Sequence, residues 1–138
     1  VISVNEFTDN EYLTMVTRQG IIKKTLLSEY EYQRKGGKIA INLDEGDELL
    51  FVTKTDGEKQ LIIATRNGSA VKFDESEVRA MGRVSRGVRG IRLREDDYVI
   101  GWERIRRIGD DIILVEVSGE YRREKRTKKF LFWIAISL

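Results

Sequence analysis

The stretch Thr17-Arg18-Gln19-Gly20 returns as Thr65-Arg66-Asn67-Gly68, 48 residues further along the chain. Around it, other identical residues recur at the same shift, and after a slip of two residues the match resumes at Gly37 and Gly87. A period near fifty residues is typical of repeat proteins, in which each unit buries its apolar face only against a neighbour. The repeat therefore decides the fold before any single element is considered.

Each repeat contains several short runs that predict β-strands. These runs are rich in β-branched and aromatic residues and are bounded by Gly, Asn or Asp; they are 12–17, 49–54, 61–65, 99–102 and 112–117. The turns 18–20 and 66–68 predict hairpins because Asn and Gly tolerate positive φ. Asp56-Gly57 predicts a further hairpin, between 49–53 and 61–65.

These elements predict an all-β fold built from a propeller-like repeat of four-stranded antiparallel blades. We expect a single domain, 1–138, with repeats at 11–58, 59–108 and, in part, 109–138.

A helix over 79–94 is the competing interpretation for that segment, since arginines recur there at every third residue. Gly82, Gly87 and Gly90 disfavour it, because each glycine costs about 1 kcal/mol in a helix. A basic loop that leads into a strand over 90–94 fits better.

The net charge of +2 hides a strong separation of sign along the chain. Residues 79–94 hold six arginines and no acid, and residues 122–129 are also basic. Acids gather at 44–48 and 95–97. Separated charges create a directional field that attracts a polyanion on the basic side, although a solvated surface is the simpler alternative for any one run. The acidic clusters lack the spacing of a calcium loop, so solvated turns are the favoured interpretation.

The composition removes the common catalytic groups. The chain has no Cys and no His, so we expect no thiolate metal site, no histidine base and no cofactor of its own. An enzyme on a β scaffold is the least favoured class.

No signal peptide is visible at 1–10, and the apolar run 130–136 is shorter than the roughly 20 residues of a membrane helix. We therefore expect a cytoplasmic protein without a membrane partner.

Two basic, glycine-rich segments, 33–38 and 82–90, occupy equivalent places in the two repeats. Glycine lets a backbone approach a phosphodiester closely, and Lys and Arg release the counterions that DNA condenses. We expect contacts with phosphates from Arg34, Lys35, Lys38, Arg83, Arg86, Arg89 and Arg92, with Lys23, Lys24 and Lys72 as weaker candidates. The alternative for each arginine is an ion pair with the acids at 44–48 or 95–97.

Several longer motifs extend this pattern. They are EYLTMVTRQG at 11–20, LDEGDEL at 43–49, ATRNG at 64–68, SEVRAMGR at 76–83 and GVRGIRL at 87–93. With these motifs the chain resembles, over about residues 5–127, the C-terminal DNA-wrapping domain of the bacterial DNA gyrase A subunit, which is shared with the related topoisomerase IV subunit. The resemblance implies a six-bladed β-pinwheel, relative to which this chain is incomplete, with two blades and the start of a third.

The resemblance also implies a non-catalytic role. A basic perimeter would bend and wrap double-stranded DNA to support ATP-dependent negative supercoiling, in a nucleoid-associated enzyme. The partners would be the remainder of the gyrase A subunit, together with the ATPase subunit, while ATP and Mg would be used elsewhere in the holoenzyme. The family's Gln-Arg-Arg-Gly-Gly-Lys-Gly box corresponds to 33–39, where Ile39 replaces the final glycine.

Two further possibilities stay open at this stage. The resemblance does not separate gyrase from topoisomerase IV, and a protein-interaction propeller without a DNA role is the other alternative. Because two blades and a fraction do not close a disc, copies of the chain could also associate through exposed blade edges.

Overall fold

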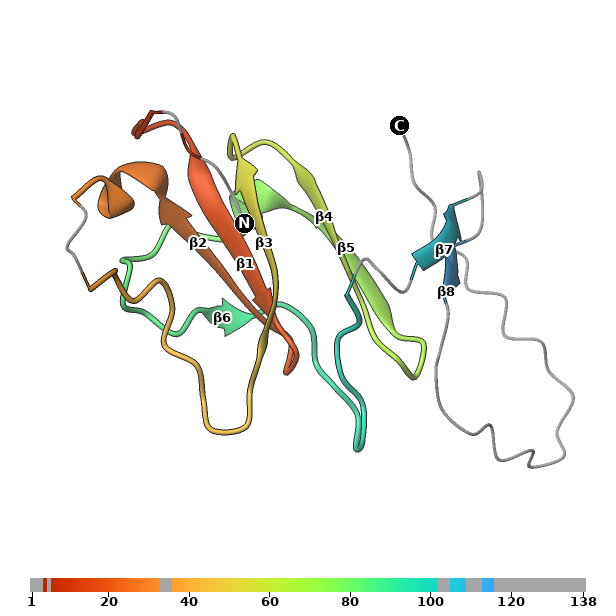
Figure 1. Ribbon diagram of the computed structural model, residues 1–138. Coiled ribbons are helices and arrows are strands. Elements are labelled where there is room, and N and C mark those ends of the chain that lie inside the picture. Colours follow the sequence, from red (N-terminus) through yellow and green to blue (C-terminus); the bar gives the residue numbers. More distant parts are fainter. Residues whose placement is uncertain (1–3, 5, 33–35, 102–104, 109–112, 116–138) are drawn as a thin grey trace, which may run out of the picture. The chain divides into compact units, whose positions relative to one another are not determined.

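The computed structural model describes residues 4, 6–32, 36–101, 105–108 and 113–115, and in these ranges the protein is built from antiparallel strands (Figure 1). The chain divides into two compact units, Val1–Ile100 and Gly101–Leu138. The basic run 122–129 and the apolar run 130–136 lie outside the described residues. Two single 3-10 turns, η1 (Leu27–Tyr30) and η2 (Glu75–Glu77), are the helical elements of the described part.

The first sheet starts from the predicted hairpin at 18–20. Strands β1 (Tyr12–Thr17) and β2 (Ile21–Leu26) pair antiparallel across this turn, and Gly20 has φ +83°, which a residue with a Cβ adopts only under strain. Strand β3 (Leu49–Thr55) pairs with the other side of β1. The short β6 (Val88–Arg89) pairs with the free side of β2, which gives the order β3-β1-β2-β6.

Strand β6 belongs to the second repeat in sequence but completes the sheet of the first. This pairing brings the backbone at residue 87 so close to β2 that only glycine fits there. A Cβ on Gly87 would lie 2.6 Å from the carbonyl oxygen of Ile22. A Cβ on Gly90 would lie 3.1 Å from Cγ2 of Ile22 in the first repeat, and 2.7 Å from Cδ1 of Ile63. These two glycines therefore serve packing between repeats, whereas the sequence suggested an approach to phosphate.

The second sheet is the hairpin of β4 (Gln60–Ala64) and β5 (Ala70–Asp74), as the turn 66–68 predicts. The hairpin predicted at Asp56-Gly57 is wrong, because β3 pairs with β1 and β4 pairs with β5. Gly57 does have the positive φ of a turn, at +90°. The turn reverses the chain and passes it from one sheet to the next, so that β4 pairs with β5, and β3 is the edge strand of the first sheet.

The strand predicted over 90–94 is also wrong: the ladder ends at Arg89. Its partner β2 begins at Ile21, so beyond that point the amides of Gly90 and Ile91 both donate to the carbonyl of Gly20, at 2.8 and 3.3 Å. The alternation of burial that the sequence predicts over these residues is nevertheless present, since Ile91 is buried and Arg92 is exposed.

The core lies between the first sheet and the β4–β5 hairpin. Its buried members come from both repeats; they are Val16, Ile22, Ile63, Val78, Ile91 and Val99. Val99, within the predicted strand 99–102, forms an isolated bridge with Thr65, and residue 102 lies outside the described ranges. The two repeats are therefore joined by apolar burial as well as by the shared strand.

The second unit contains one described hairpin. Strands β7 (Ile105–Ile108) and β8 (Ile113–Val115) pair antiparallel, with Ile105 opposite Val115. Strand β8 lies within the predicted strand 112–117, whose remaining residues fall outside the described part. In the described ranges the structure contains no helix with the length and apolar character needed to cross a membrane.

Candidate nucleic-acid interface

Residues that follow the first basic, glycine-rich segment lie beside the second such segment in the structure. We call residues 79–94 the basic segment and residues 36–42 the Lys38 segment. Both reach the β2 side of the first sheet, where the basic segment supplies the edge strand β6 (Figure 1). They are hydrogen-bonded to each other, because the Arg83 guanidinium donates to the carbonyl of Ile39 at 2.6 Å. Segments more than forty residues apart in sequence thus form one surface.

Arg83 and Arg86 have different surroundings within the basic segment. Arg83 is half-buried and uses one N–H on Ile39, which leaves further donors of its guanidinium for an anion. Arg86 is exposed and pairs with Asp44 at 2.8 Å. An exposed pair of this kind contributes only about 0–1 kcal/mol, so a phosphate can compete with Asp44 for Arg86.

Arg89, Arg92 and Lys72 are also exposed. Within the described ranges, none of the three forms an ion pair with an acid. Arg89 lines a groove of about 270 Å³ between β6 and β5. Lys72 lies on β5, where it alternates with the half-buried Val71 and Phe73. The exposed positive charge therefore continues past Arg86.

The Lys38 segment supplies one described cation. Lys38 is half-buried; its ammonium lies 3.5 Å from the carbonyl of Glu29 and 5.9 Å from the centre of the Tyr32 ring. Arg34 and Lys35, which the sequence also predicted as phosphate contacts, lie outside the described residues. Of the box-like stretch 33–39, the structure therefore positions only residues 36–39 against the basic segment.

Lys23 and Lys24 are buried, which corrects the expectation that they are available to phosphates. Lys23 has no exposed surface, and its ammonium donates to the carbonyls of Ala40, at 2.7 Å, and of Arg83. Burial, aided by the charge of Arg83, lowers the pKa of Lys23 below its usual value. Lys24 donates to the carbonyl of Glu75 at 2.9 Å. The strand pattern did not indicate this, because alternation in a strand with one wet face would expose one of two consecutive lysines.

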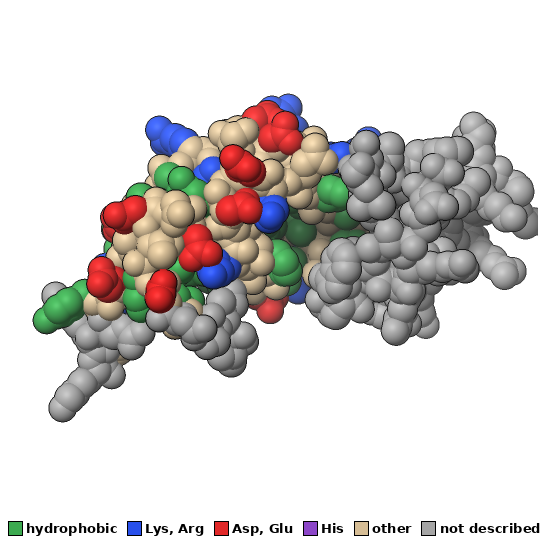
Figure 2. Space-filling view, turned by 90° about the horizontal axis from the view of Figure 1, so that it is seen from above, with side chains coloured by type: hydrophobic (Ala, Val, Ile, Leu, Met, Phe, Trp, Pro, Cys, Tyr) green, Lys and Arg blue, Asp and Glu red, His purple; other side chains and the backbone are tan. Residues whose placement is uncertain are grey.

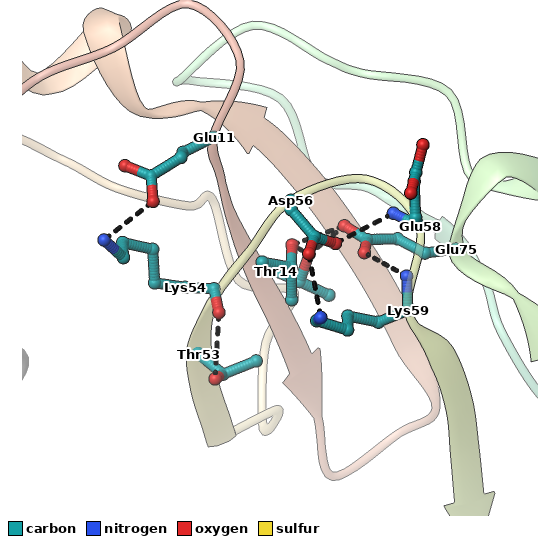
Figure 3. A network of polar contacts seen from close by, with 9 residues as sticks. Glu11, Thr14, Thr53, Lys54, Asp56, Glu58, Lys59 and Glu75 are labelled. Atoms are coloured by element: carbon teal, nitrogen blue, oxygen red, sulfur yellow. Dashed lines mark hydrogen bonds and ion pairs between the residues drawn. The ribbon is translucent and has the colours of Figure 1, made fainter. Parts of the chain in front are cut away.

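A buried carboxylate, that of Glu75, lies next to Thr14 of the first sheet (Figure 3), and Lys24 donates to the backbone carbonyl of the same residue. Glu75 accepts hydrogen bonds from the hydroxyls of Thr14, at 3.2 Å, and Thr55, and from the amide of Lys59 at 3.3 Å. Nearby, Asp56 and Lys59 form an exposed ion pair at 2.8 Å. This network joins η2 to β1 and β3 and was not foreseen from the sequence.

The acidic clusters close the hairpin turns. Asp47 accepts the amide of Gln19 at 2.9 Å, and Asp97 accepts the amide of Asn67 at the same distance. Each carboxylate also accepts the amide of the residue that follows it, at 2.8 and 2.9 Å. Among the described residues, no group of three or more acids is placed to hold a metal ion.

The turns at 18–20 and 66–68, which we call the hairpin tips, carry two further arginines that were not predicted as site residues from the sequence. Arg18 lies over the Tyr98 ring at 4.3 Å and pairs with Glu48 at 3.3 Å, and Arg66 lies 5.7 Å from the same ring. Their recurrence in the repeat was the available signal. Because Tyr98 contacts both guanidinium groups and Glu48 pairs with Arg18, these arginines stabilise the tips.

The end of the sheets that carries the β3–β4 connection is mixed in charge. Figure 2 looks onto this end and shows Asp and Glu side chains spread over its described part, with Lys and Arg between them. Two of its lysines are paired, Lys54 with Glu11 and Lys59 with Asp56, both at 2.8 Å. A polyanion would therefore meet uncompensated positive charge at the basic segment rather than at this end.

The chain is similar to known proteins over most of its length. The family model described as "DNA gyrase C-terminal domain, beta-propeller" matches residues 11–56 and 59–106. A DNA gyrase A subunit of Halalkalibacterium halodurans is 50% identical over 91 residues, which are 66% of this chain and 11% of that protein. The DNA gyrase A subunit of Escherichia coli K12 is 39% identical over 130 residues, 94% of this chain and 15% of that protein.

Two solved structures share the fold. A crystal structure of the C-terminal domain of DNA topoisomerase IV superposes with a TM-score of 0.68 at 43% identity and covers 71% of this chain and 31% of that chain. A structure of a DNA gyrase A C-terminal domain gives 0.61 at 28% identity, with 70% and 32% covered. The chain spans 11 to 15% of the length of the curated relatives that it matches.

Proposed function

The chain belongs to the family of DNA gyrase C-terminal β-propeller domains, and on this premise we propose that it is a non-catalytic DNA-binding module of a type IIA topoisomerase subunit. The module bends duplex DNA along the Lys38 segment and the basic segment. In doing so it supports ATP-dependent negative supercoiling by a holoenzyme that contains the remainder of the gyrase A subunit together with the ATPase subunit. ATP and Mg act elsewhere in that holoenzyme, which works on the nucleoid in the cytoplasm.

The observation that carries this proposal is the junction of two basic segments from different repeats. Arg83 is hydrogen-bonded to Ile39 next to Lys38, and Arg86, Arg89 and Arg92 follow on the same segment. Bending a stiff duplex needs several phosphate contacts to offset the elastic cost. A surface that gathers cations from successive repeats supplies such contacts along a line.

The contacts would be made to the DNA backbone. Lys and Arg on exposed loops neutralise phosphates in any sequence, so affinity would vary little with base sequence and steeply with salt. Each phosphate contact contributes about −0.9 to the slope of log K against log salt concentration.

The test is binding to a labelled duplex of about 40 base pairs, long enough to follow a curved surface, across a salt series. The parent chain is compared with a triple variant, Arg83→Ala, Arg86→Ala and Arg89→Ala. We expect tight, salt-sensitive binding by the parent chain, and a slope shallower by about 2 to 3 in the variant because up to three phosphate contacts are lost.

The matched control removes three positive charges away from the basic segment, with Lys54→Ala, Lys59→Ala and Arg66→Ala. Its net charge equals that of the triple variant, yet its salt slope should stay close to that of the parent chain. Equal losses in both triples would refute the location of the interface. Absence of binding at low salt would favour the protein-interaction propeller instead.

A topoisomerase IV subunit is the second candidate, favoured by the 43% identity to the C-terminal domain of DNA topoisomerase IV. Sealing nicked plasmid with ligase in the presence of the chain tests whether DNA is wrapped: wrapping with a defined hand leaves a change in linking number in the closed product, and bending alone leaves none. Self-association through blade edges stays a prediction, which sedimentation of the free chain tests.

A further inference from the structure

Lys23 connects the two segments of the proposed interface from beneath. Its side chain rises from β2, is fully buried, and donates to the carbonyl of Ala40 in the Lys38 segment and to that of Arg83 in the basic segment. The Tyr30 hydroxyl donates to the same Ala40 carbonyl at 3.2 Å. One ammonium group is therefore shared by two loops that are 43 residues apart in the chain.

The loops also contact each other above Lys23. Arg83 donates to Ile39 at 2.6 Å, the Asn42 side chain donates to the carbonyl of Val84 at 2.5 Å, and the Asn42 amide lies 3.4 Å from the carbonyl of Ser85. The upper contacts are made by exposed or half-buried residues that water can reach. The contact made by Lys23 is shielded from water, because the whole Lys23 side chain is buried.

Burial of an ammonium group is costly unless its N–H groups are bonded, so its presence here needs a reason. The equivalent position in the second repeat is Val71, which fills its place on β5 without a charge. An apolar residue would satisfy packing at position 23 in the same way. What Val cannot supply is a donor to two loop carbonyls at once.

We propose that Lys23 is a positioning residue for DNA binding: its buried ammonium clamps the Lys38 segment to the basic segment, so that Lys38, Arg83 and Arg86 act on duplex phosphates as one preorganised cluster. The inference rests on the proposed function. Preorganisation raises affinity because the loops lose less conformational freedom when DNA binds. Lys23 itself does not touch DNA, since it has no exposed surface.

The first arm of the test compares Lys23→Met with Lys24→Met. Both changes remove a buried ammonium from β2, but the residues point to opposite faces of the sheet, and Lys24 holds η2 rather than the loops. We expect Lys23→Met to lower DNA affinity about tenfold, equivalent to 1.4 kcal/mol, while Lys24→Met has a smaller effect. Circular dichroism verifies that each variant is folded.

The second arm measures the clamp without DNA. The chain has no native cysteine, and Ile39 and Val84 are 60% and 55% exposed, so Ile39→Cys with Val84→Cys places two reactive thiols on the two loops. A short bis-maleimide should cross-link them rapidly in the parent and Lys24→Met backgrounds, and several-fold more slowly with Lys23→Met. Asn42→Ala, an exposed change that leaves the core intact, should slow cross-linking in the same direction.

The cross-link also provides a rescue. Once formed in the Lys23→Met background, it should restore most of the lost DNA affinity, which a purely structural loss would not allow. A folded Lys23→Met chain with parental affinity and parental cross-linking rate overturns the inference, as does a cross-linked variant that stays weak. If the parent chain binds no DNA, the proposed function fails, and the cross-linking rates still decide whether Lys23 is a clamp.

Discussion

The hairpin tips of the two repeats have the same structure, whereas the strands that follow them present different side chains to their surroundings. In both tips the glycine amide donates to the threonine carbonyl at 3.1 Å, and an aspartate about thirty residues further on accepts the second turn amide at 2.9 Å. These interactions lie within one repeat, and they demand the same residues in each copy.

The strands differ where they meet another repeat. Lys23 on β2 corresponds to Val71 on β5, and Leu27 after β2 corresponds to Glu75 after β5. Leu27 and Glu75 are both fully buried, yet one packs as a hydrocarbon and the other accepts hydrogen bonds from Thr14 and Thr55. The comparison shows that the repeat preserves contacts within a unit, while contacts between units are specific to each position.

The largest effect is expected at the glycines that the repeat equates, Gly37 and Gly87. Both have positive φ, +76° and +105°, but a Cβ on Gly87 would lie 2.6 Å from the Ile22 carbonyl, and one on Gly37 would meet nothing within 4 Å. Gly87→Ala should cost about 3 kcal/mol or more from strain and clash, and Gly37→Ala about 1 kcal/mol from strain alone. Urea denaturation measures both, and equal losses would contradict the packing role of Gly87.

The buried carboxylate gives the next effect. Glu75→Leu, which copies the residue of the first repeat, should cost about 2 kcal/mol, because the hydroxyls of Thr14 and Thr55 lose their shared acceptor. Glu75→Gln keeps an acceptor oxygen and should cost less. The two free energies of unfolding give the measurement. A Glu75→Leu chain as stable as the parent would mean that the two repeats are interchangeable here.

The aspartates of the two tips should differ by a smaller amount. Asp97 accepts the Thr65 hydroxyl at 2.7 Å in addition to two amides, whereas Asp47 accepts the two amides of its own tip. Asp97→Ala should therefore cost about 1 kcal/mol more than Asp47→Ala, the contribution of one hydrogen bond. Thermal unfolding of the two variants measures the difference between their losses of stability. In a Thr65→Val background, which lacks the hydroxyl, this difference should disappear.

The smallest effect concerns pH at the β3–β4 connection. Lys59 and the amide of Glu58 lower the pKa of Asp56, and Lys54 lowers the pKa of Glu11. Because these folded-state values lie below the unfolded ones, their contribution to stability is present above about pH 4 and is lost as the pH falls further. Asp56→Asn should make stability less dependent on pH below 4. High salt should weaken this difference, since the pair is exposed; a difference that salt leaves unchanged would contradict it.

The sequence predicted the parts of the fold that rest on local interactions. Hairpins at 18–20 and 66–68 were recoverable because Gly, Asn and β-branched residues constrain the backbone on their own. The same reasoning failed at Asp56-Gly57, where the turn is present but the partner strand is β1. A turn residue indicates a reversal of the chain and does not indicate whether the strands on its two sides pair with each other.

The candidate interface shows the same division. Composition and repeat equivalence singled out 33–38 and 82–90 as basic segments at equivalent places in the two repeats, and in the structure Arg86, Arg89 and Arg92 are exposed. Their contacts with phosphates stay predictions. Lys23 and Lys24 were misjudged because consecutive lysines predict at least one exposed side chain, whereas loops on one side and η2 on the other bury both.

By itself, the sequence determined that the chain is a β repeat with a period near fifty residues, that its turns lie at the paired glycines, and that its positive charge gathers in a few separate runs, among them 79–94 and 122–129. Only the tertiary structure decided that β6 completes the sheet of the preceding repeat, that Glu75 and Lys23 are buried, and that two basic loops meet. The physical reason is the distance along the chain over which each kind of interaction acts. Backbone preference and charge act over a few residues, whereas burial and hydrogen-bond partners depend on which distant segment covers each face.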